Sequence, residues 1–297
     1  MDPADQTGCD ELSLARGPAS FHLRTMSLDV VDLRSFYAAP LGHLARHVIG
    51  RAMLKFWPDC GRQRVLGLGY STPYLPLLGA RAERVLALMP AAQGVINWPA
   101  PERSASALVE PTLLPLPTAS IDRAVLVHAL EETESPEDLL EEVARILNPG
   151  GRMILVVPNR RGLWARMDAT PFGQGRPFSR SQLTNLLRGA EFSAENWAEA
   201  LYVPPLRSRV MIRSAPVWER IGVGLSLPFA GVHVIDATKQ VYRRAPLRAT
   251  RRSFAFRPSL LPQPTPAPRL RVDKEEPARP RSAAFASPVL KAADNGP

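Results

Sequence analysis

The chain has 297 residues, of which 45% are hydrophobic, and its formal net charge is +9. This length holds one large α/β domain with tails or two small domains, and a domain of ~200 residues buries roughly 70% of its unfolded-chain surface. Two cysteines, Cys9 and Cys60, are too few for a disulfide scaffold or a cysteine zinc site, and the five histidines lack ligand spacing, so we predict no metal site.

The two ends of the chain differ in composition from the part between them. Residues 1–25 hold four acidic and two basic residues without periodic apolar positions, so we predict a disordered leader, with Met26 as a candidate start. Residues 243–297 hold twelve Lys or Arg, four Asp or Glu and ten prolines, which predicts a disordered basic tail. That leaves only +3 for the predicted domain, residues 26–242, which argues against nucleic acid as a partner.

No stretch of the sequence is a candidate membrane span or secretory signal. The first residues are acidic and lack a continuous apolar run. The uncharged stretch 221–235 is interrupted by glycines and by Pro228, and it falls short of ~20 residues. We therefore expect a cytoplasmic protein.

An amphipathic helical segment comes first in the predicted domain. A helical pattern begins at Asp32 and resumes after Pro40. Its apolar residues recur at three- and four-residue spacing and form one face, namely Leu41, Leu44, Val48, Ala52 and Phe56. We predict a helix laid against the domain that follows.

From residue 64 onwards, short apolar strands alternate with helices. Strands are predicted at 64–68, 84–89, 106–109, 123–129, 152–157, 195–202 and 232–240. Helices are predicted at 73–79, 90–95, 135–147, 180–188 and 207–223, with Ser135 and Ser179 as N-caps. Unbroken apolar strands separated by helices imply a parallel sheet covered on both faces. Such sheets bind ligands at the carboxyl ends of their strands.

The turn after the first strand is the first candidate binding feature. Residues 65–73, VLGLGYSTP, combine an apolar strand, a tight turn at Gly69 and a helix start at Pro73. Such a turn aims backbone N–H groups and a helix N-terminus into a crevice where a nucleotide-like ligand can sit. Taken alone, the pattern also fits an ordinary strand-to-helix connection.

Three further motifs follow in order: residues 114–122 read LPLPTASID, 128–132 read HALEE, and 144–151 read ARILNPGG. With them, residues 60–158 resemble the class I S-adenosylmethionine-dependent methyltransferases, particularly the type-11 group. The resemblance implies a Rossmann-like α/β fold whose mostly parallel sheet has seven strands, the last one antiparallel. It also implies that S-adenosylmethionine lies across the first four strands.

Carried over by position, the resemblance assigns roles to several residues. Gly69 would lie against the methionine part of the cofactor, Glu110 would face the adenine amino group, and His128 would lie beneath the transferring methyl. The family's acidic position in the first strand is Gly67 here, Ser71 replaces its second glycine, and Met89 replaces the carboxylate that holds the ribose. One missing charge-assisted contact costs on the order of 1.5–3 kcal/mol, so we expect weak or absent binding of S-adenosylmethionine.

The segment 159–178 is the predicted lid over a pocket for the methyl acceptor. It resembles an uncharacterised bacterial subgroup of these methyltransferase-like proteins, a resemblance that identifies no substrate. Its arginines, Arg160, Arg161 and Arg176 among them, lie on glycine-rich loops and can clamp an anionic acceptor. A solvated basic loop is the alternative interpretation.

Two hypotheses remain open at this stage. The first is a methyltransferase for a small, anionic acceptor, in which the protein positions the reactants and excludes water. His128 and Tyr202 are then the candidate general bases. The second is a binding or regulatory protein that keeps the methyltransferase fold and has lost the donor site, as Gly67 and Met89 suggest.

Overall fold

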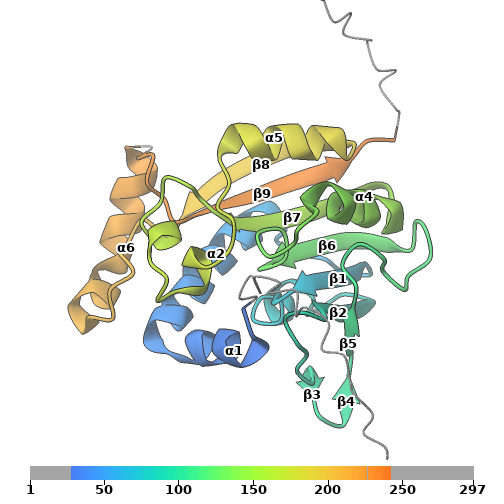
Figure 1. Ribbon diagram of the computed structural model, residues 1–297, viewed down its shortest axis with the longest axis horizontal. Helices are drawn as coiled ribbons and strands as arrows, with labels where there is room; N and C mark the ends of the chain where they lie inside the picture. Colours follow the sequence, from blue (N-terminus) through green and yellow to red (C-terminus); the bar gives the residue numbers. More distant parts are fainter. Residues whose placement is uncertain (1–27, 226, 242–297) are drawn as a thin grey trace, which may run out of the picture. The chain divides into compact units, whose positions relative to one another are not determined.

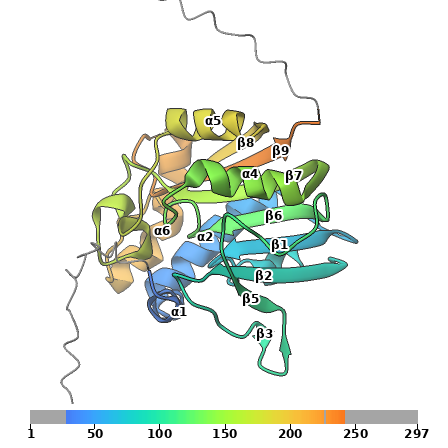
Figure 2. The same ribbon diagram turned by 45° about the vertical axis from the view of Figure 1, so that its right-hand side comes forward.

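The computed structural model describes residues 28–225 and 227–241 (Figures 1 and 2). The chain divides into two units, 1–247 and 248–297, and every described residue belongs to the first. The predicted leader, 1–25, and the predicted tail, 243–297, lie outside the described residues.

A seven-stranded sheet forms the centre of the described unit, with the strand order β5-β2-β1-β6-β7-β9-β8. Its strands are β1 (Arg64–Gly69), β2 (Arg84–Pro90), β5 (Ser106–Val109), β6 (Ile121–Val127), β7 (Leu147–Pro158), β8 (Phe192–Ala200) and β9 (Val232–Lys239). Strand β9 runs antiparallel to both of its neighbours, and the other four pairs are parallel. The predicted mostly parallel sheet, with its last strand antiparallel, is confirmed.

Helices cover both faces of this sheet, which separates two hydrophobic clusters (Figure 1). The helices are α1 (Val30–Ala38), α2 (Pro40–Phe56), α3 (Leu75–Leu78), α4 (Pro136–Ile146), α5 (Arg180–Gly189) and α6 (Arg209–Gly224). Alternate strand residues point to opposite faces. Val65 and Val125 therefore pack with α1 and α2, whereas Leu66 and Leu126 pack with α4 and α5.

The first two helices form as the sequence predicts, but the buried face of α2 is shifted. Helix α1 begins two residues earlier than expected, because the Asp29 side chain caps it by accepting from the Val31 N–H at 2.8 Å. In α2 the fully buried side includes Ala45, Ile49 and Met53, whereas the predicted Leu44, Val48 and Phe56 are only partly buried. Small residues cause the shift: a Cβ on Gly42 would lie 2.0 Å from the Phe36 carbonyl oxygen, so this side of α2 approaches its neighbours closely.

Several element boundaries differ from the prediction. The helix expected at 90–95 is a turn after β2, and Gly94 in it has a φ of +92°. The helix expected at 73–79 is only Leu75–Leu78. Strand β7 begins at Leu147, so the NPGG sequence expected to stop α4 lies inside the strand.

Of three further local features, one agrees with the prediction and two do not. The short hairpin of β3 (Pro99–Ala100) and β4 (Arg103–Ser104) was not predicted. Ser179 caps α5 in a full capping box with Gln182, as predicted. Ser135 precedes α4 without a side-chain capping bond.

Candidate functional site

The turn after β1 lies against the end of β6 and requires glycine at position 69. Gly69 has a φ of +75°, and a Cβ there would lie 2.3 Å from the carbonyl oxygen of Val127 and 2.8 Å from that of His128. Only glycine adopts this backbone at such a close approach without strain. The turn therefore brings the exits of two central strands together at the carboxyl edge of the sheet.

The space that a carboxylate side chain at position 67 would need is filled by Ser71 and Leu75. A Cβ on Gly67 would lie 2.0 Å from Ser71 Oγ and 2.8 Å from a methyl group of Leu75. Ser71 is fully buried, and its hydroxyl has no hydrogen-bond partner among the described residues. The glycine in the strand thus makes room for the serine in the turn.

The ends of β2 and β5 carry Met89 and Glu110, which lie in opposite environments. Met89 is fully buried in the cluster beneath α1 and α2. Glu110 is exposed, and its carboxylate accepts a hydrogen bond from the Thr112 hydroxyl at 3.3 Å. The exit of β2 therefore presents a thioether inside the protein, and the exit of β5 presents a carboxylate to solvent.

His128 is the centre of the site. It ends β6 with a φ of +49°, and its side chain is fully buried. Its Nε2 lies 3.0 Å from the Tyr37 hydroxyl, and its Nδ1 lies 3.2 Å from a carboxylate oxygen of Glu131. Its carbonyl accepts a hydrogen bond from the Gln93 side chain at 3.1 Å. The imidazole thus lies between a phenol and a carboxylate.

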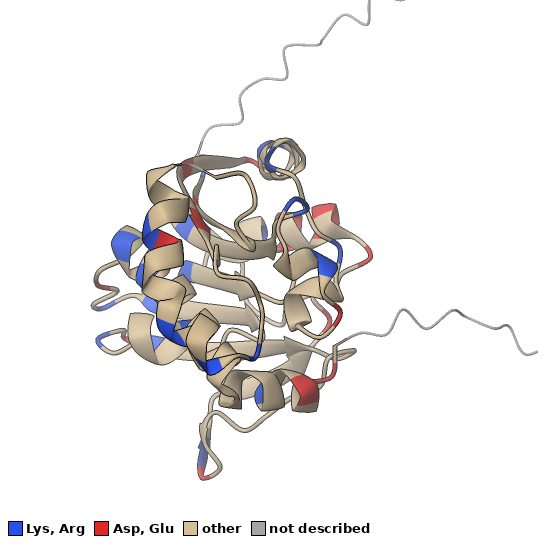
Figure 3. Cartoon of the chain, turned by 90° about the vertical axis from the view of Figure 1, so that its left-hand side faces the viewer, with Lys and Arg blue, Asp and Glu red and all other residues tan. Residues whose placement is uncertain are grey.

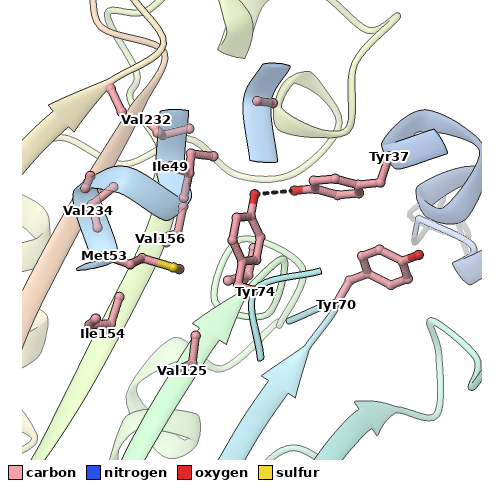
Figure 4. Packing of buried hydrophobic residues seen from close by; sticks show 14 of the residues in the cluster. Tyr37, Ile49, Met53, Tyr70, Tyr74, Val125, Ile154, Val156, Val232 and Val234 are labelled. Atoms are coloured by element: carbon pink, nitrogen blue, oxygen red, sulfur yellow. Dashed lines mark hydrogen bonds between the residues drawn. The ribbon is translucent and has the colours of Figure 1, made fainter. Parts of the chain in front are cut away.

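Aromatic side chains close the space around this imidazole. The Tyr37 ring stacks on Tyr70 at 5.5 Å, and the Tyr37 hydroxyl lies 3.1 Å from that of Tyr74 (Figure 4). The Phe172 ring lies 4.7 Å from that of His128. Burial raises the pKa of Tyr37 and Tyr74 well above the usual range for tyrosine, so both phenols are protonated at neutral pH.

Buried polar atoms without partners gather at the same edge. Eight such side-chain atoms occur within the described ranges, and six of them belong to segments that follow β1, β2 or β6. These six are Ser71 Oγ, Gln93 Oε1, His128 Nδ1, Glu131 Oε1 and Oε2, and Glu132 Oε1. Two of them, His128 Nδ1 and Glu131 Oε1, lie 3.2 Å apart and pair with each other, which leaves four without a polar contact. Burial raises the pKa of the neighbouring Glu132 carboxyl. Because an unpaired buried polar atom is costly, such a concentration is typical of a place that binds a polar ligand or water.

The segment 159–178 packs on the exit of β6, where the sequence predicted a lid. A Cβ on Gly175 would lie 2.7 Å from Glu131 Cγ, and the Arg176 N–H donates to the Glu131 carbonyl at 2.9 Å. The side chains of Arg160, Arg161 and Arg176 are all exposed. None of these three arginines forms an ion pair within the described part of the chain.

Tyr202, the second candidate base, lies in a different environment. Its ring packs against Gly222 of α6, and its hydroxyl donates to Glu199 at 3.1 Å. Burial and the nearby Glu199 raise the pKa of Tyr202. Among the described residues, no contact joins it to His128.

Access to the buried site is blocked in this conformation. Ser71, His128 and Glu131 are each at most 2% exposed. A groove of about 740 Å³ lies outside the aromatic cluster, between α1, residues 168–174 and the start of α6. Phe36 lines this groove and contacts Phe172, with ring centroids 6.3 Å apart. The Phe172 ring in turn lies 4.7 Å from that of His128, so the two phenylalanines form a chain of contacts from the groove to the imidazole.

Sequence reasoning did not identify three residues of this site: Tyr37, Gln93 and Glu131. Tyr37 falls within the helical pattern predicted from Asp32, and its contact with His128 was missed because α1 and β6 are far apart in the sequence. Gln93 was placed in the helix that does not form. Glu131 follows His128 by three residues, a spacing that could have marked the pair.

Comparisons with known proteins find one family model that matches part of the sequence and several solved structures with a similar fold. Residues 64–155 match the family model described as a methyltransferase domain. A Thermotoga maritima S-adenosylmethionine-dependent methyltransferase, described as a possible histamine N-methyltransferase, is similar with a TM-score of 0.52 at 19% identity, over 71% of this chain and 96% of that one. A Haloferax volcanii putative methyltransferase, solved with its Trm112 activator, gives 0.49 at 17% identity over 71% and 98%. An Archaeoglobus fulgidus methyltransferase gives 0.48 at 17% identity over 65% and 94%.

At these identities the likeness to solved structures shows the fold alone. No curated protein matches the sequence. In the part of the chain that the structure describes, no helix is long and apolar enough to cross a membrane. The same residues contain no group of three or more His, Cys, Asp or Glu arranged to hold a metal ion.

Proposed function

We propose that this protein, whose residues 64–155 match the family model of a methyltransferase domain, is an S-adenosylmethionine-dependent methyltransferase with a small, anionic acceptor. The observation that carries the proposal is the group of four buried polar atoms without a polar contact at the carboxyl edge of β1, β2 and β6, next to the paired His128 and Glu131. Ligands of open α/β sheets bind at this edge.

The residues present fit one end of the cofactor better than the other. Glu131 Oε2 is a carboxylate oxygen without a partner, which suits an ammonium group, and Ser71 has an unpartnered hydroxyl. At the ribose end, Met89 offers no hydrogen-bond acceptor of comparable strength. We therefore infer that the methionine end of the cofactor provides most of the recognition and that affinity is low.

The chain's own residues suit the transfer of a methyl group to an acceptor that loses a proton. S-adenosylmethionine, when bound, supplies an electrophilic methyl group on a sulfonium. The carboxylate of Glu131 beside His128 Nδ1 favours the tautomer with hydrogen on Nδ1, which leaves Nε2 as a proton acceptor. In the closed conformation the Tyr37 hydroxyl donates to that Nε2, so displacing Tyr37 frees the base.

Opening of α1 and of segment 159–178 belongs to the same proposal. The aromatic rings of Tyr37 and Phe172 cover His128 and exclude water from it. Helix α1 is joined to the turn after β2 by the Val30 N–H, which donates to the Gln93 carbonyl at 2.8 Å. An arrangement of this kind suits a lid that closes after the reactants bind.

The anionic character of the acceptor rests on the exposed arginines. Arg176 is the first choice because its backbone is bonded to Glu131, which places it at the rim of the site. Guanidinium groups pair with carboxylate or phosphate in a bidentate manner. The proposal thus specifies the acceptor by its negative charge.

A non-catalytic role is the second candidate. The observations that favour it are the buried Met89, which stands in place of the family's ribose carboxylate, and the filled space at Gly67, which leaves no room for the family's acidic side chain in the first strand. On this alternative the aromatic cluster is a permanent core, and the fold binds a partner by another surface.

Calorimetric titration with S-adenosylmethionine separates the two candidates. The wild-type chain should bind with micromolar or weaker affinity, and Glu131→Gln should weaken binding about tenfold or more, because a charge-assisted contact is lost. Glu134→Gln is the matched control, since Glu134 is exposed on the same segment. No heat with S-adenosylmethionine or S-adenosylhomocysteine would contradict the enzyme proposal and favour the non-catalytic one.

A further inference from the structure

Helix α6 leaves a row of large apolar side chains in solvent. Six apolar side chains of α6 and of the residue that follows it are 37–74% exposed: Val210, Val217, Trp218, Ile221, Val223 and Leu225. Val210, Val217 and Ile221 follow one another at spacings of seven and four, so they lie on one side of the helix. Ala215 and Gly222, on another side of the helix, are buried, whereas Val223 is exposed away from the row.

A stripe of arginines runs beside this apolar row. Arg209, Arg213 and Arg220 also follow one another at spacings of four and seven, and all three are exposed. The single acidic residue of α6, Glu219, turns inward, where its carboxylate accepts from the Tyr202 N–H at 2.7 Å. The outer surface of α6 is therefore apolar on one side, cationic on the other, and free of carboxylates.

Helix α2, which contacts α6, extends the cationic surface. It contains no acidic residue, and its Arg51 and Lys55 are exposed. Figure 3 looks at the side of the molecule on which α6 lies and shows Lys and Arg gathered along the helices of this side. None of the cations of α2 and α6 forms an ion pair within the residues that the structure describes.

We propose that α6 docks on an anionic lipid surface, with its apolar row at the acyl boundary and its arginines at the headgroups. A helix with an apolar side and an arginine-rich side suits the membrane interface, where tryptophan is also favoured. The cations of α2 and α6 complement the negative charge of such a surface. The proposal does not depend on the proposed enzymatic activity.

Other occupants fit this surface less well. Exposed valine, isoleucine and leucine side chains contribute little to binding nucleic acid, which is recognised by cations, polar groups and aromatic stacking. Residues 243–297 of the chain carry a net charge of +8, so they are repelled by the arginines rather than attracted. A second copy would place two cationic surfaces opposite each other.

Vesicle sedimentation of the full chain tests the proposal. The protein should bind vesicles of phosphatidylcholine with about one-third phosphatidylglycerol, and bind pure phosphatidylcholine much more weakly. Arg213→Gln with Arg220→Gln should lower the partition coefficient about thirtyfold. The matched control is Arg84→Gln with Arg103→Gln, because both of these arginines are exposed away from α2 and α6.

The apolar row has its own variants and controls. Val217→Ser with Ile221→Ser should lower partitioning at least about tenfold. Leu108→Ser with Leu113→Ser removes apolar residues of similar exposure elsewhere and should leave partitioning unchanged. All these residues are exposed, so the variants retain the fold, which their melting curves check.

Measuring how deeply Trp218 enters the bilayer distinguishes docking by α6 from electrostatic attraction between the basic residues 243–297 and the lipid headgroups. Lipids brominated along the acyl chain should quench tryptophan fluorescence, and Trp218→Phe should remove most of that quenching. Vesicle binding without quenching of Trp218 would overturn the proposal. So would a concentration-dependent dimer that Val217→Ser with Ile221→Ser abolishes, since the apolar row would then belong to a contact between copies.

Discussion

Replacing Met89 by aspartate restores the carboxylate that is missing at the exit of β2, at a cost in stability. Met89 is fully buried. The substitution loses the burial of a methionine, about 1.5–3 kcal/mol. It also buries a carboxyl without a partner, which costs a further ~1–3 kcal/mol. We therefore expect Met89→Asp to lower the free energy of unfolding by about 2.5–6 kcal/mol, and Met89→Leu to lower it by less than about 1.5 kcal/mol.

The destabilisation caused by Met89→Asp should increase with pH. Burial raises the pKa of the new carboxyl in the folded state above the unfolded value of ~3.9. The cost is therefore smallest below that value, and it grows as the pH rises through the raised folded pKa. Urea unfolding of Met89→Asp and Met89→Leu between acidic and neutral pH measures this difference.

The same variant links stability to the ligand. Ribose hydroxyls of S-adenosylhomocysteine would give the aspartate hydrogen bonds, so the ligand should raise the melting temperature of Met89→Asp more than that of wild type. If Met89→Asp unfolds at the same urea concentration as Met89→Leu at every pH, Met89 is not sealed in the core and the reasoning is refuted. A large destabilisation that ligand does not relieve would favour the non-catalytic alternative.

Three further predictions follow from single contacts. Gly69→Ala should destabilise the fold by about 1–3 kcal/mol from backbone strain alone, and more from the contact with the Val127 carbonyl; chemical denaturation measures it, and an unchanged midpoint would contradict the tight turn. Tyr37→Phe should cost about 1–3 kcal/mol, because buried His128 Nε2 loses its partner; a neutral effect would show that water replaces the phenol. Burial lowers the pKa of His233 to about 4. The stability that this shift contributes is therefore present above pH ~6.5 and is lost as the pH falls towards 4. His233→Gln should flatten the dependence of the free energy of unfolding on pH in this range, and an unchanged dependence would refute the prediction.

The sheet could be predicted from the sequence because its determinants are local. Strands β1, β2 and β5 were predicted to within about one residue, since each is an apolar run bounded by polar residues or turns. The capping box of α5 is likewise contained within four residues, Ser179 to Gln182. Such features need no knowledge of distant contacts.

The candidate site could be predicted only in part because it is built from distant segments. The Tyr37 hydroxyl contacts His128, which lies 91 residues further along the chain. The Val30 N–H likewise donates to the carbonyl of Gln93, which lies in the turn after β2. The sequence predicted the edge of the sheet and a helix from Asp32, and the resemblance pointed to His128, but neither showed that Tyr37 of that helix contacts His128. The buried side of α2 was misplaced for a related reason: packing at Gly42 and Ala45 depends on small size rather than on hydrophobicity.

Hydrogen–deuterium exchange of the full chain with saturating S-adenosylhomocysteine tests the central claim most directly, because it reports where the ligand acts. If the donor binds among the unpartnered polar atoms, exchange should slow in residues 69–74 and 128–132 and change in residues 30–38 and 159–178, which must open and close. Exchange that is unaltered in 69–74 and 128–132 would contradict a donor site at this edge of the sheet.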